Sequence, residues 1–241
     1  MRAYTCNAFG PLDTHGPGAL PAPQPADDEV IIDVAAAGVN YYDTLIVQGK
    51  YQIRPGFPFS PGGEFAGTIA ALGAGVAGFQ LGQRVLAFNS YGGYAERARA
   101  RARQVFPLPD AVSFDQAAAA LVAYATAWFA LYDRGRLKAG ETVLVLGAAG
   151  GVGLAAVQIA RAAGCTVIAA ASTADKLALC QQAGASIGIN YREADLKEAV
   201  KAATAGRGAD VVIDVVGGAF TEAAVRATAW RGRVLVIGFA A

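Results

Sequence analysis

The chain has 241 residues, of which 54% are hydrophobic and 16% are charged, and this balance excludes a disordered protein. The formal charge of +1 gives no overall attraction to nucleic acid. The cysteines Cys6, Cys165 and Cys180 are too scattered for a disulfide framework or a zinc pattern, and the single histidine, His15, lies in a Pro/Gly loop. We therefore expect a globular, cytoplasmic protein with reduced thiols and no membrane span.

The first part of the chain contains short apolar runs separated by glycine and proline turns. Strands are expected at residues 2–6, 29–35, 64–71 and 84–88, with two more between 94 and 106. A short helix is expected at 41–47, and Pro/Gly-rich loops are expected at 12–25 and 50–62. This pattern is typical of a compact, barrel-like β domain.

Arginine occupies every second position from Arg97 through Arg99 and Arg101 to Arg103. On a strand, a period of two places all four side chains on one face. One interpretation is a patch that binds anions or nucleic acid. The other is a solvated sheet face that alternates with alanine, and the near-neutral net charge favours it.

The pattern changes at Ser113, which is a candidate N-cap for a helix that extends to about Tyr132. Strands then alternate with helices. Strands are expected at 142–146, 166–171, 186–189, 210–215 and 233–237, and helices at 154–163, 174–183, 193–203 and 219–228. Such alternation predicts an α/β fold with a doubly wound parallel sheet. We place the boundary between the two domains, residues 1–110 and 111–241, near Pro107 and Pro109.

A glycine-rich turn follows the strand at 142–146. Its sequence is Gly147-Ala148-Ala149-Gly150-Gly151-Val152-Gly153. Strand, glycine turn and helix in this order form the phosphate end of a dinucleotide-binding unit, because glycines allow close backbone approach and the helix start attracts anions. Alanine replaces the first glycine of the usual fingerprint, so the match is incomplete. We expect Ala149, Gly150, Gly151 and Val152 to bind the cofactor.

The end of the strand at 166–171 distinguishes between the two nicotinamide cofactors. NAD sites usually have an acid here that binds the ribose 2′-hydroxyl. In this chain Ser172, Thr173 and Lys176 follow instead, and a hydroxyl with a cation suits a 2′-phosphate. The sequence therefore predicts NADPH, unless Lys176 is only a solvated helix residue.

Two residues after the third strand of this part, Tyr191 and Arg192, are candidates for the adenine or 2′-phosphate end. The alternative is a polar loop. Only five strands are expected in the second domain, whereas a dinucleotide-binding sheet of six strands would continue. We therefore expect the printed chain to be truncated at its C-terminus.

Further motifs extend over nearly the whole chain. They are Ala37-Gly38-Val39-Asn40-x-x-Asp43, Gly49-Lys50-Tyr51, Pro61-Gly62-Gly63-Glu64-x-x-Gly67, Gly82-Gln83-Arg84-Val85, Gly92-Gly93-Tyr94-Ala95-Glu96 and Thr126-Ala127. With the glycine turn, they make the chain resemble the medium-chain dehydrogenase/reductase superfamily, and within it the zinc-free quinone oxidoreductases related to zeta-crystallin. The resemblance implies a GroES-like catalytic domain followed by an NADPH-binding Rossmann domain.

Two positions depart from the zinc-dependent alcohol dehydrogenases, which have cysteine where Asn40 stands and histidine where Gly63 stands. Without thiolate or imidazole ligands a catalytic zinc cannot be held, so no metal is expected. Without a Lewis acid, alcohol oxidation is difficult, and an acceptor that takes hydride readily is expected. Glu64 is then expected to remain as a scaffold carboxylate.

The resemblance also implies roles for individual residues. Asn40, Asp43 and Tyr51 would line the nicotinamide and substrate end, with Tyr51 binding and protonating the developing oxyanion. The nicotinamide itself would meet Thr126, Val216, Ile237 and Phe239. The alternatives are that Asn40 only caps the helix after it and that Tyr51 only packs in a loop.

The function expected from these residues is hydride transfer from NADPH to a quinone. The alternative within enzymes is an NADPH-dependent reductase of activated C=C bonds in enones or enals. A non-enzymatic alternative is an NADPH-binding structural or RNA-binding protein. A homodimer is expected for a complete chain. If the natural protein ends at Ala241, a third alternative is a protein without activity.

Overall fold

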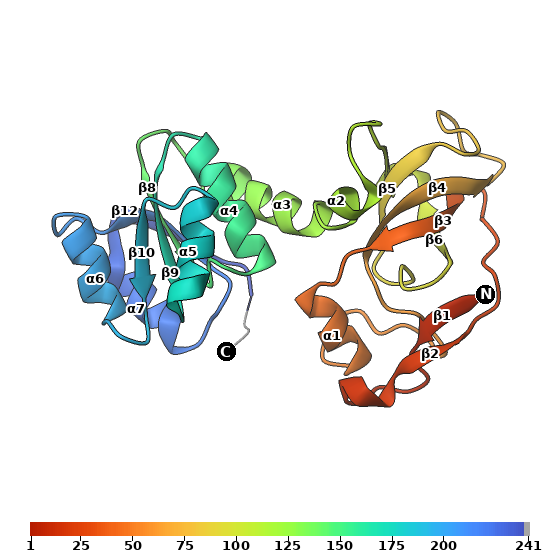
Figure 1. Cartoon of the computed structure of the whole chain (residues 1–241), viewed down its shortest axis with the longest axis horizontal. Coiled ribbons are helices and arrows are strands. Elements are labelled where there is room, and N and C mark those ends of the chain that lie inside the picture. The colour runs from red at the N-terminus through yellow and green to blue at the C-terminus, as the bar shows by residue number, and fades with distance from the viewer. Residues whose placement is uncertain (239–241) are drawn as a thin grey trace. The chain divides into compact units, whose positions relative to one another are not determined.

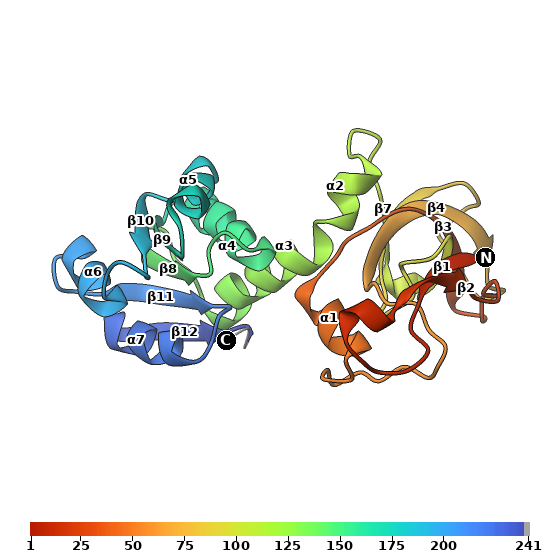
Figure 2. The ribbon, with the colours of Figure 1, turned by 60° about the horizontal axis from the view of Figure 1, so that its bottom comes forward.

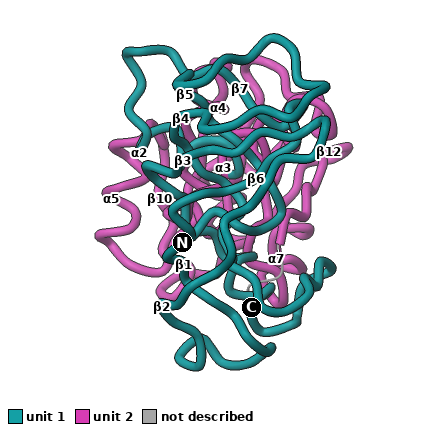
Figure 3. Tube along the Cα trace, turned by 90° about the vertical axis from the view of Figure 1, so that its right-hand side faces the viewer, with its two compact units in different colours: residues 1–122 teal, residues 123–241 magenta. Residues whose placement is uncertain are grey.

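The computed structural model describes residues 1–238. The chain folds into two compact units, Met1–Val122 and Ala123–Ala241 (Figure 3). The predicted boundary near residue 110 lies before helix α2 (Phe114–Ala118). Ala117 and Ala118 of this helix pack against Ala66 in the core of the first unit, so α2 is part of that unit.

The first unit contains two antiparallel sheets (Figure 1). The small sheet pairs β1 (Arg2–Thr5) with β2 (Gly16–Ala19). The large sheet has the order β6 (Arg97–Arg101), β3 (Glu29–Ala37), β4 (Glu64–Leu72), β5 (Arg84–Phe88) and β7 (Val105–Pro107). Helix α1 (Tyr41–Val47) follows β3. The β-rich domain is confirmed, and its core consists of alternate, inward-facing strand residues such as Val30, Ile32 and Phe65.

The prediction of a loop over residues 12–25 is wrong at two places. Leu12–Thr14 forms a 3₁₀ turn, and Gly16–Ala19 forms strand β2. Glycine and proline give this segment little intrinsic tendency to form a strand. Its backbone groups pair with β1 instead, with Arg2 opposite Ala19, so tertiary pairing overrides the local preference.

Three of the four alternating arginines lie on β6, and Arg103 lies in the 3₁₀ turn Ala102–Gln104. The expectation that all four share a strand is therefore wrong for Arg103. The other three pair with carboxylates on or beside β3. The pairs are Arg97–Asp33 at 2.7 Å, Arg99–Glu29 at 3.4 Å and Arg101–Asp28 at 3.9 Å. These ion pairs neutralise the row of positive charge, which favours a solvated sheet face.

The helix expected from Ser113 to about Tyr132 is broken into three pieces. Ser113 does cap α2, since its hydroxyl accepts a hydrogen bond from the Gln116 N–H at 3.2 Å. Helix α3 (Leu121–Trp128) and a π-helical segment (Phe129–Arg134) follow. A new helix start leaves backbone N–H groups free, and that of Val122 donates to the Glu64 carboxylate at 2.8 Å.

The second unit is a five-stranded parallel sheet with helices on both faces (Figure 2). The strand order is β10 (Ile187–Asn190), β9 (Thr166–Ala171), β8 (Thr142–Leu146), β11 (Ala209–Asp214) and β12 (Thr228–Val236). The helices are α4 (Gly151–Ala162), α5 (Ala174–Gln182), α6 (Leu196–Ala203) and α7 (Ala219–Ala227). The predicted doubly wound sheet is confirmed.

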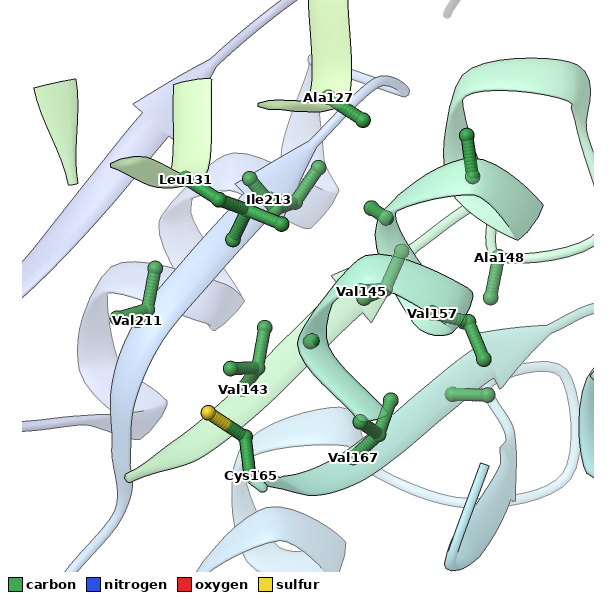
Figure 4. Close-up of a cluster of buried hydrophobic side chains, with 14 of the residues drawn as sticks. Ala127, Leu131, Val143, Val145, Ala148, Val157, Cys165, Val167, Val211 and Ile213 are labelled. Atoms are coloured by element: carbon green, nitrogen blue, oxygen red, sulfur yellow. The ribbon is translucent and has the colours of Figure 1, made fainter. Parts of the chain in front are cut away.

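Side chains alternate between the two faces of this sheet. Val143 and Val145 of β8 pack with α3 and α4 on one face (Figure 4). Leu144 and Leu146 pack with α6 and α7 on the other. Burial on both faces explains the uninterrupted apolar run of β8. Among the helices within residues 1–238, none combines the length and the apolar character needed to cross a bilayer.

In the second unit, three element starts differ from their predicted positions by more than one residue. Helix α4 begins at Gly151 rather than 154, because the glycines themselves form its first turn. Helix α6 begins at Leu196 rather than 193, because the side chain of Asp195 caps it by accepting from the Glu198 N–H. Strand β12 begins at Thr228, five residues before the strand predicted at 233–237. Its pairing with β11 is irregular between Thr228 and Arg233.

Arg233 on β12 connects several parts of the second unit. Its guanidinium donates to both oxygens of Glu141, at 2.8 and 2.9 Å. It also donates to the carbonyl oxygens of Gly135 at 2.8 Å and Asp210 at 3.0 Å. The hydrogen bonds from Arg233 lower the pKa of the Glu141 carboxyl, so this ion pair stabilises the folded state above the unfolded-state pKa of Glu141.

We predict that Arg233→Met lowers the free energy of unfolding by about 2–3 kcal/mol, because it removes a charged donor from several partly buried acceptors. Urea unfolding at pH 7 measures the change. Arg226→Met is the matched control, since Arg226 forms an exposed pair with Glu222 on α7 and its loss should cost less than about 0.5 kcal/mol. Equal losses in the two variants would contradict the prediction.

Candidate functional site

The glycine-rich turn of the second unit lies directly between β8 and α4. Gly147 has a φ of +59°, a conformation that side chains rarely tolerate. Gly153 is buried against the same turn, and a Cβ there would overlap the carbonyl oxygen of Gly147. Glycine is therefore required at both positions for the helix to start this close to the strand.

The start of α4 is suited to an anion. Gly150 is the N-cap and has no side chain to satisfy the first N–H groups of a twelve-residue helix. Gly150 and Gly151 are exposed, and Ala149 and Val152 are partly buried beside them. Free N–H groups and the helix dipole favour a phosphate at this place, so these residues fit a pyrophosphate.

The predicted 2′-phosphate residues lie at the end of the neighbouring strand, β9. Ser172 is buried, and its Oγ accepts a hydrogen bond from the Lys176 Nζ at 3.2 Å. Thr173 caps α5 by accepting from the Lys176 N–H at 3.4 Å, which keeps Lys176 in the first turn of that helix. A hydroxyl and an ammonium group are thus brought together beside the strand that carries the glycine turn.

Tyr191 follows β10 at the same edge of the sheet. Its N–H donates to the carbonyl oxygen of Ala171 at 3.2 Å, and its ring lies 4.6 Å from the ring of Phe220 on α7. Arg192 is exposed, and its N–H donates to Asn190 Oδ1 at 3.1 Å. The partly buried Tyr191 ring forms an apolar surface at the carboxyl end of the sheet, and its contact with adenine stays a prediction.

Asp214 is a residue that the sequence reasoning missed. It ends β11 and is fully buried. Its Oδ1 accepts the N–H groups of Val216 and Gly217, both at 2.9 Å, and its Oδ2 accepts the Thr221 hydroxyl. An acid directly after the apolar run Val211-Val212-Ile213 of this strand was the available signal.

Asp214 also connects two residues predicted for the nicotinamide side. Its side chain holds the N–H of Val216, and its backbone carbonyl accepts the Ile237 N–H at 2.8 Å. The segment after β12 therefore lies beside the turn after β11. Phe239, predicted for the same side, lies outside the described residues.

Thr126 is partly buried on α3, which belongs to the same unit from Ala123 onward. Helix α3 lies next to the glycine turn, since the Ala123 Cβ is 3.9 Å from the position a Cβ of Gly151 would take. The segments after the carboxyl ends of the strands and the first turns of α4 and α5 thus carry all the predicted cofactor residues within residues 1–238 except Thr126.

The predicted substrate residues lie in the first unit, around the start of α1. Asn40 is the N-cap, and its N–H donates to Asp43 Oδ2 at 2.9 Å. The Asn40 side-chain Nδ2 donates to Glu64 Oε1 at 2.9 Å. Asn40 therefore both starts the helix and binds the buried carboxylate that also accepts from Val122.

Asp43 is 3% exposed and has a second polar neighbour besides Asn40, the Tyr94 hydroxyl. The Tyr94 hydroxyl lies 2.9 Å from Asp43 Oδ2 and 3.1 Å from the carbonyl oxygen of Gly38. Burial raises the pKa of Asp43, and the hydrogen bonds from Asn40 and Tyr94 only partly oppose that rise. Burial and the nearby Asp43 charge raise the pKa of Tyr94, so its phenol keeps its proton.

Tyr51 packs against Tyr42, with ring centroids 5.5 Å apart. The Tyr42 hydroxyl is buried, has no hydrogen-bond partner within residues 1–238, and rests against Gly63. A Cβ on Gly63 would overlap that hydroxyl, so Tyr42 fills the space that any side chain at position 63 would need. Burial, followed by the charge of Asp43, raises the pKa of Tyr42.

Two family models match the chain. The alcohol dehydrogenase GroES-like domain matches residues 26–110, and the zinc-binding dehydrogenase model matches residues 151–241. Over the described residues 1–238, no group of three or more His, Cys, Asp or Glu side chains is arranged to hold a metal ion.

The chain is also similar to individual proteins. It is 41% identical over 221 residues to quinone oxidoreductase-like protein 2 of Rattus norvegicus, covering 91% of this chain and 63% of the relative. It is 39% identical over 245 residues to the quinone oxidoreductase of Homo sapiens, covering 99% and 73%. The chain therefore spans between three fifths and three quarters of the length of these relatives.

A crystal structure of the Escherichia coli quinone oxidoreductase complexed with NADPH matches with a TM-score of 0.92 at 34% identity, covering 97% of this chain and 72% of that one. The two units are thus a GroES-like domain and a Rossmann domain. The chain belongs to the medium-chain dehydrogenase/reductase superfamily, in its zinc-free quinone oxidoreductase branch.

The buried Glu64 carboxyl predicts how the stability of the protein depends on pH. Burial raises the pKa of its carboxyl, and the hydrogen bonds from Asn40 and Val122 oppose the rise only in part. The pKa of Glu64 is therefore higher in the folded state than in the unfolded state, where it is near 4.5. The contribution of Glu64 to the free energy of unfolding is then complete below pH 4.5 and is lost as the pH rises through the folded-state pKa. We predict that Glu64→Gln gains stability relative to the wild type between pH 4.5 and pH 8.

Urea unfolding at several pH values measures this difference. Glu64→Ala is the companion variant, because it leaves the Asn40 amide and the Val122 N–H without their acceptor. Compared with Glu64→Gln, it should lose about 2–3 kcal/mol at every pH, because neither variant carries the titrating carboxyl. A stability difference between the wild type and Glu64→Gln that does not change with pH would contradict the argument.

Proposed function

We propose that this protein transfers hydride from NADPH to a quinone without a metal. The observation that carries the proposal is the Ser172–Lys176 pair at the end of β9, with an Nζ–Oγ distance of 3.2 Å. The corresponding acid of an NAD site would repel a 2′-phosphate, whereas an ammonium group attracts it. The names of the relatives and the NADPH complex of the E. coli protein support the same cofactor and acceptor.

The cofactor would be held by residues of the second unit. The turn from Ala149 to Val152 would bind the pyrophosphate, and Ser172 with Lys176 would bind the 2′-phosphate. The nicotinamide end would meet Thr126, Val216 and Ile237. When bound, NADPH supplies the hydride, and the chain supplies orientation and a dry environment.

The acceptor would be held by the first unit. We propose that Tyr51 donates a hydrogen bond to the acceptor oxygen, which becomes negative as hydride arrives, and then gives up its proton. Asn40 would line the same place. The buried Asp43, already bonded to Asn40 and Tyr94, would act as a positioning residue that keeps Asn40 at the start of α1.

The acceptor class follows from the two positions that differ from zinc enzymes. Asn40 and Gly63 provide neither a thiolate nor an imidazole, and Tyr42 fills the space beside Gly63. An acceptor that takes hydride without a Lewis acid is required, and quinones do so. Homodimer formation and a cytoplasmic location stay predictions.

We predict that Lys176→Ala raises the KM for NADPH about tenfold and leaves the KM for NADH within about twofold, because only NADPH carries the 2′-phosphate. Steady-state rates with each cofactor and a saturating quinone measure the effect. Lys197→Ala on α6 is the control, since Lys197 pairs with Glu198 on an exposed helix face. Equal effects of Lys176→Ala on both cofactors would remove the 2′-phosphate role.

A comparison of acceptors tests the proposed reaction. NADPH oxidation is measured with a 1,4-benzoquinone, with cyclohexenone and with an aldehyde. We expect kcat/KM for the quinone to exceed that for the enone by about tenfold or more. A preference for the enone would instead identify a reductase of activated C=C bonds, and no turnover with any acceptor would favour a non-enzymatic role.

A further inference from the structure

A pocket of about 380 Å³ lies entirely within the first unit. Its lining residues are Tyr4, Leu12, Val39, Asp43, Thr44, Val47, Pro61 and Tyr94. Asp43, Val47 and Pro61 are buried and form its floor. Two apolar side chains, Leu12 at 50% exposure and Val39 at 80%, are left open to solvent on its wall.

The polar side chains around this pocket are bonded within the chain, except that Asp43 Oδ1 has no hydrogen-bond partner within residues 1–238 and is itself buried from solvent. The Tyr94 hydroxyl lies 2.9 Å from Asp43 Oδ2. The Tyr4 hydroxyl donates to the carbonyl oxygen of His15 at 3.1 Å, and the Thr44 hydroxyl donates to that of Tyr41 at 2.7 Å. An occupant would therefore find apolar surface and no free donor, which suits a hydrocarbon group rather than a polar one.

The pocket also lies beside the residues proposed to hold the acceptor. Asp43 belongs to its floor and bonds to the backbone of Asn40, and Val39 on its wall directly precedes Asn40. A molecule bound by its polar ring near Asn40 could extend a substituent into the pocket.

We propose that this pocket binds the hydrocarbon side chain of a substituted quinone. The proposal rests on the proposed function and adds a substrate class to it, namely quinones with an alkyl or isoprenoid substituent. The substituent covers Leu12 and Val39 and removes their apolar surface from water, which supplies the binding free energy. The ring keeps its reactive carbonyl outside the pocket.

Two quinones with the same ring test the proposal. One is 2,3-dimethoxy-5-methyl-1,4-benzoquinone, and the other carries an additional decyl chain. With the wild-type protein and NADPH, the decyl compound should have a KM about tenfold lower, because the chain becomes buried. Leu12→Glu places a charge on the pocket wall and should abolish this advantage, while the rate with the unsubstituted ring stays unchanged.

The matched control is Leu81→Glu, the same exchange at a 65% exposed residue of the same unit that does not line the pocket. It should leave both KM values unchanged. Equal KM values for the two quinones in the wild type, or equal effects of the two substitutions, would overturn the proposal.

A binding measurement separates this proposal from the proposed function. Quenching of tyrosine fluorescence by the decyl quinone, without NADPH, reports binding, and Tyr4 and Tyr94 line the pocket. The wild type should bind the decyl quinone about tenfold more tightly than Leu12→Glu does, even if no quinone is turned over. Equal affinities would overturn the assignment of the pocket to the hydrocarbon chain, whether or not the protein reduces quinones.

Discussion

The buried carboxylate of Glu64 is the interaction on which the first unit depends most. It accepts the side chain of Asn40 at the start of α1 and the N–H of Val122 at the start of α3. Two helix starts far apart in sequence are thereby held against β4. Because burial makes its charge costly, the carboxylate stabilises the unit only while both donors remain in place. These contacts support the prediction that Glu64 is a scaffold carboxylate.

The second unit has a comparable buried carboxylate at the carboxyl edge of its sheet. Asp214 gathers the N–H groups of Val216 and Gly217, and its carbonyl accepts the N–H of Ile237. The glycine turn before α4 reaches the same edge without side-chain help, since Gly147 and Gly153 leave room for close backbone packing. Because these backbone turns are held in place within the chain, the free N–H groups at the start of α4 have a fixed position, which favours the orientation of a ligand.

Local sequence features predicted much of the fold, and their failures have physical causes. Helix α1 and strands β5, β8 and β9 have the expected bounds, because their periodicity and end residues agree. Strand β2 was missed because pairing with β1 outweighs its Gly/Pro content. The break between α2 and α3 was missed because its partner, Glu64, lies more than fifty residues away in the sequence.

The sequence by itself determined the two-part architecture, the glycine turn, the absence of an acid at the end of β9 and the residues at positions 40 and 63. Those features are local, since each depends on residue type and spacing along one segment. Only the tertiary structure decided that Lys176 reaches Ser172, that Asp214 connects two turns, and that Tyr42 fills the space beside Gly63. These contacts depend on side-chain direction and on the close packing of separate elements, which no spacing in the sequence specifies.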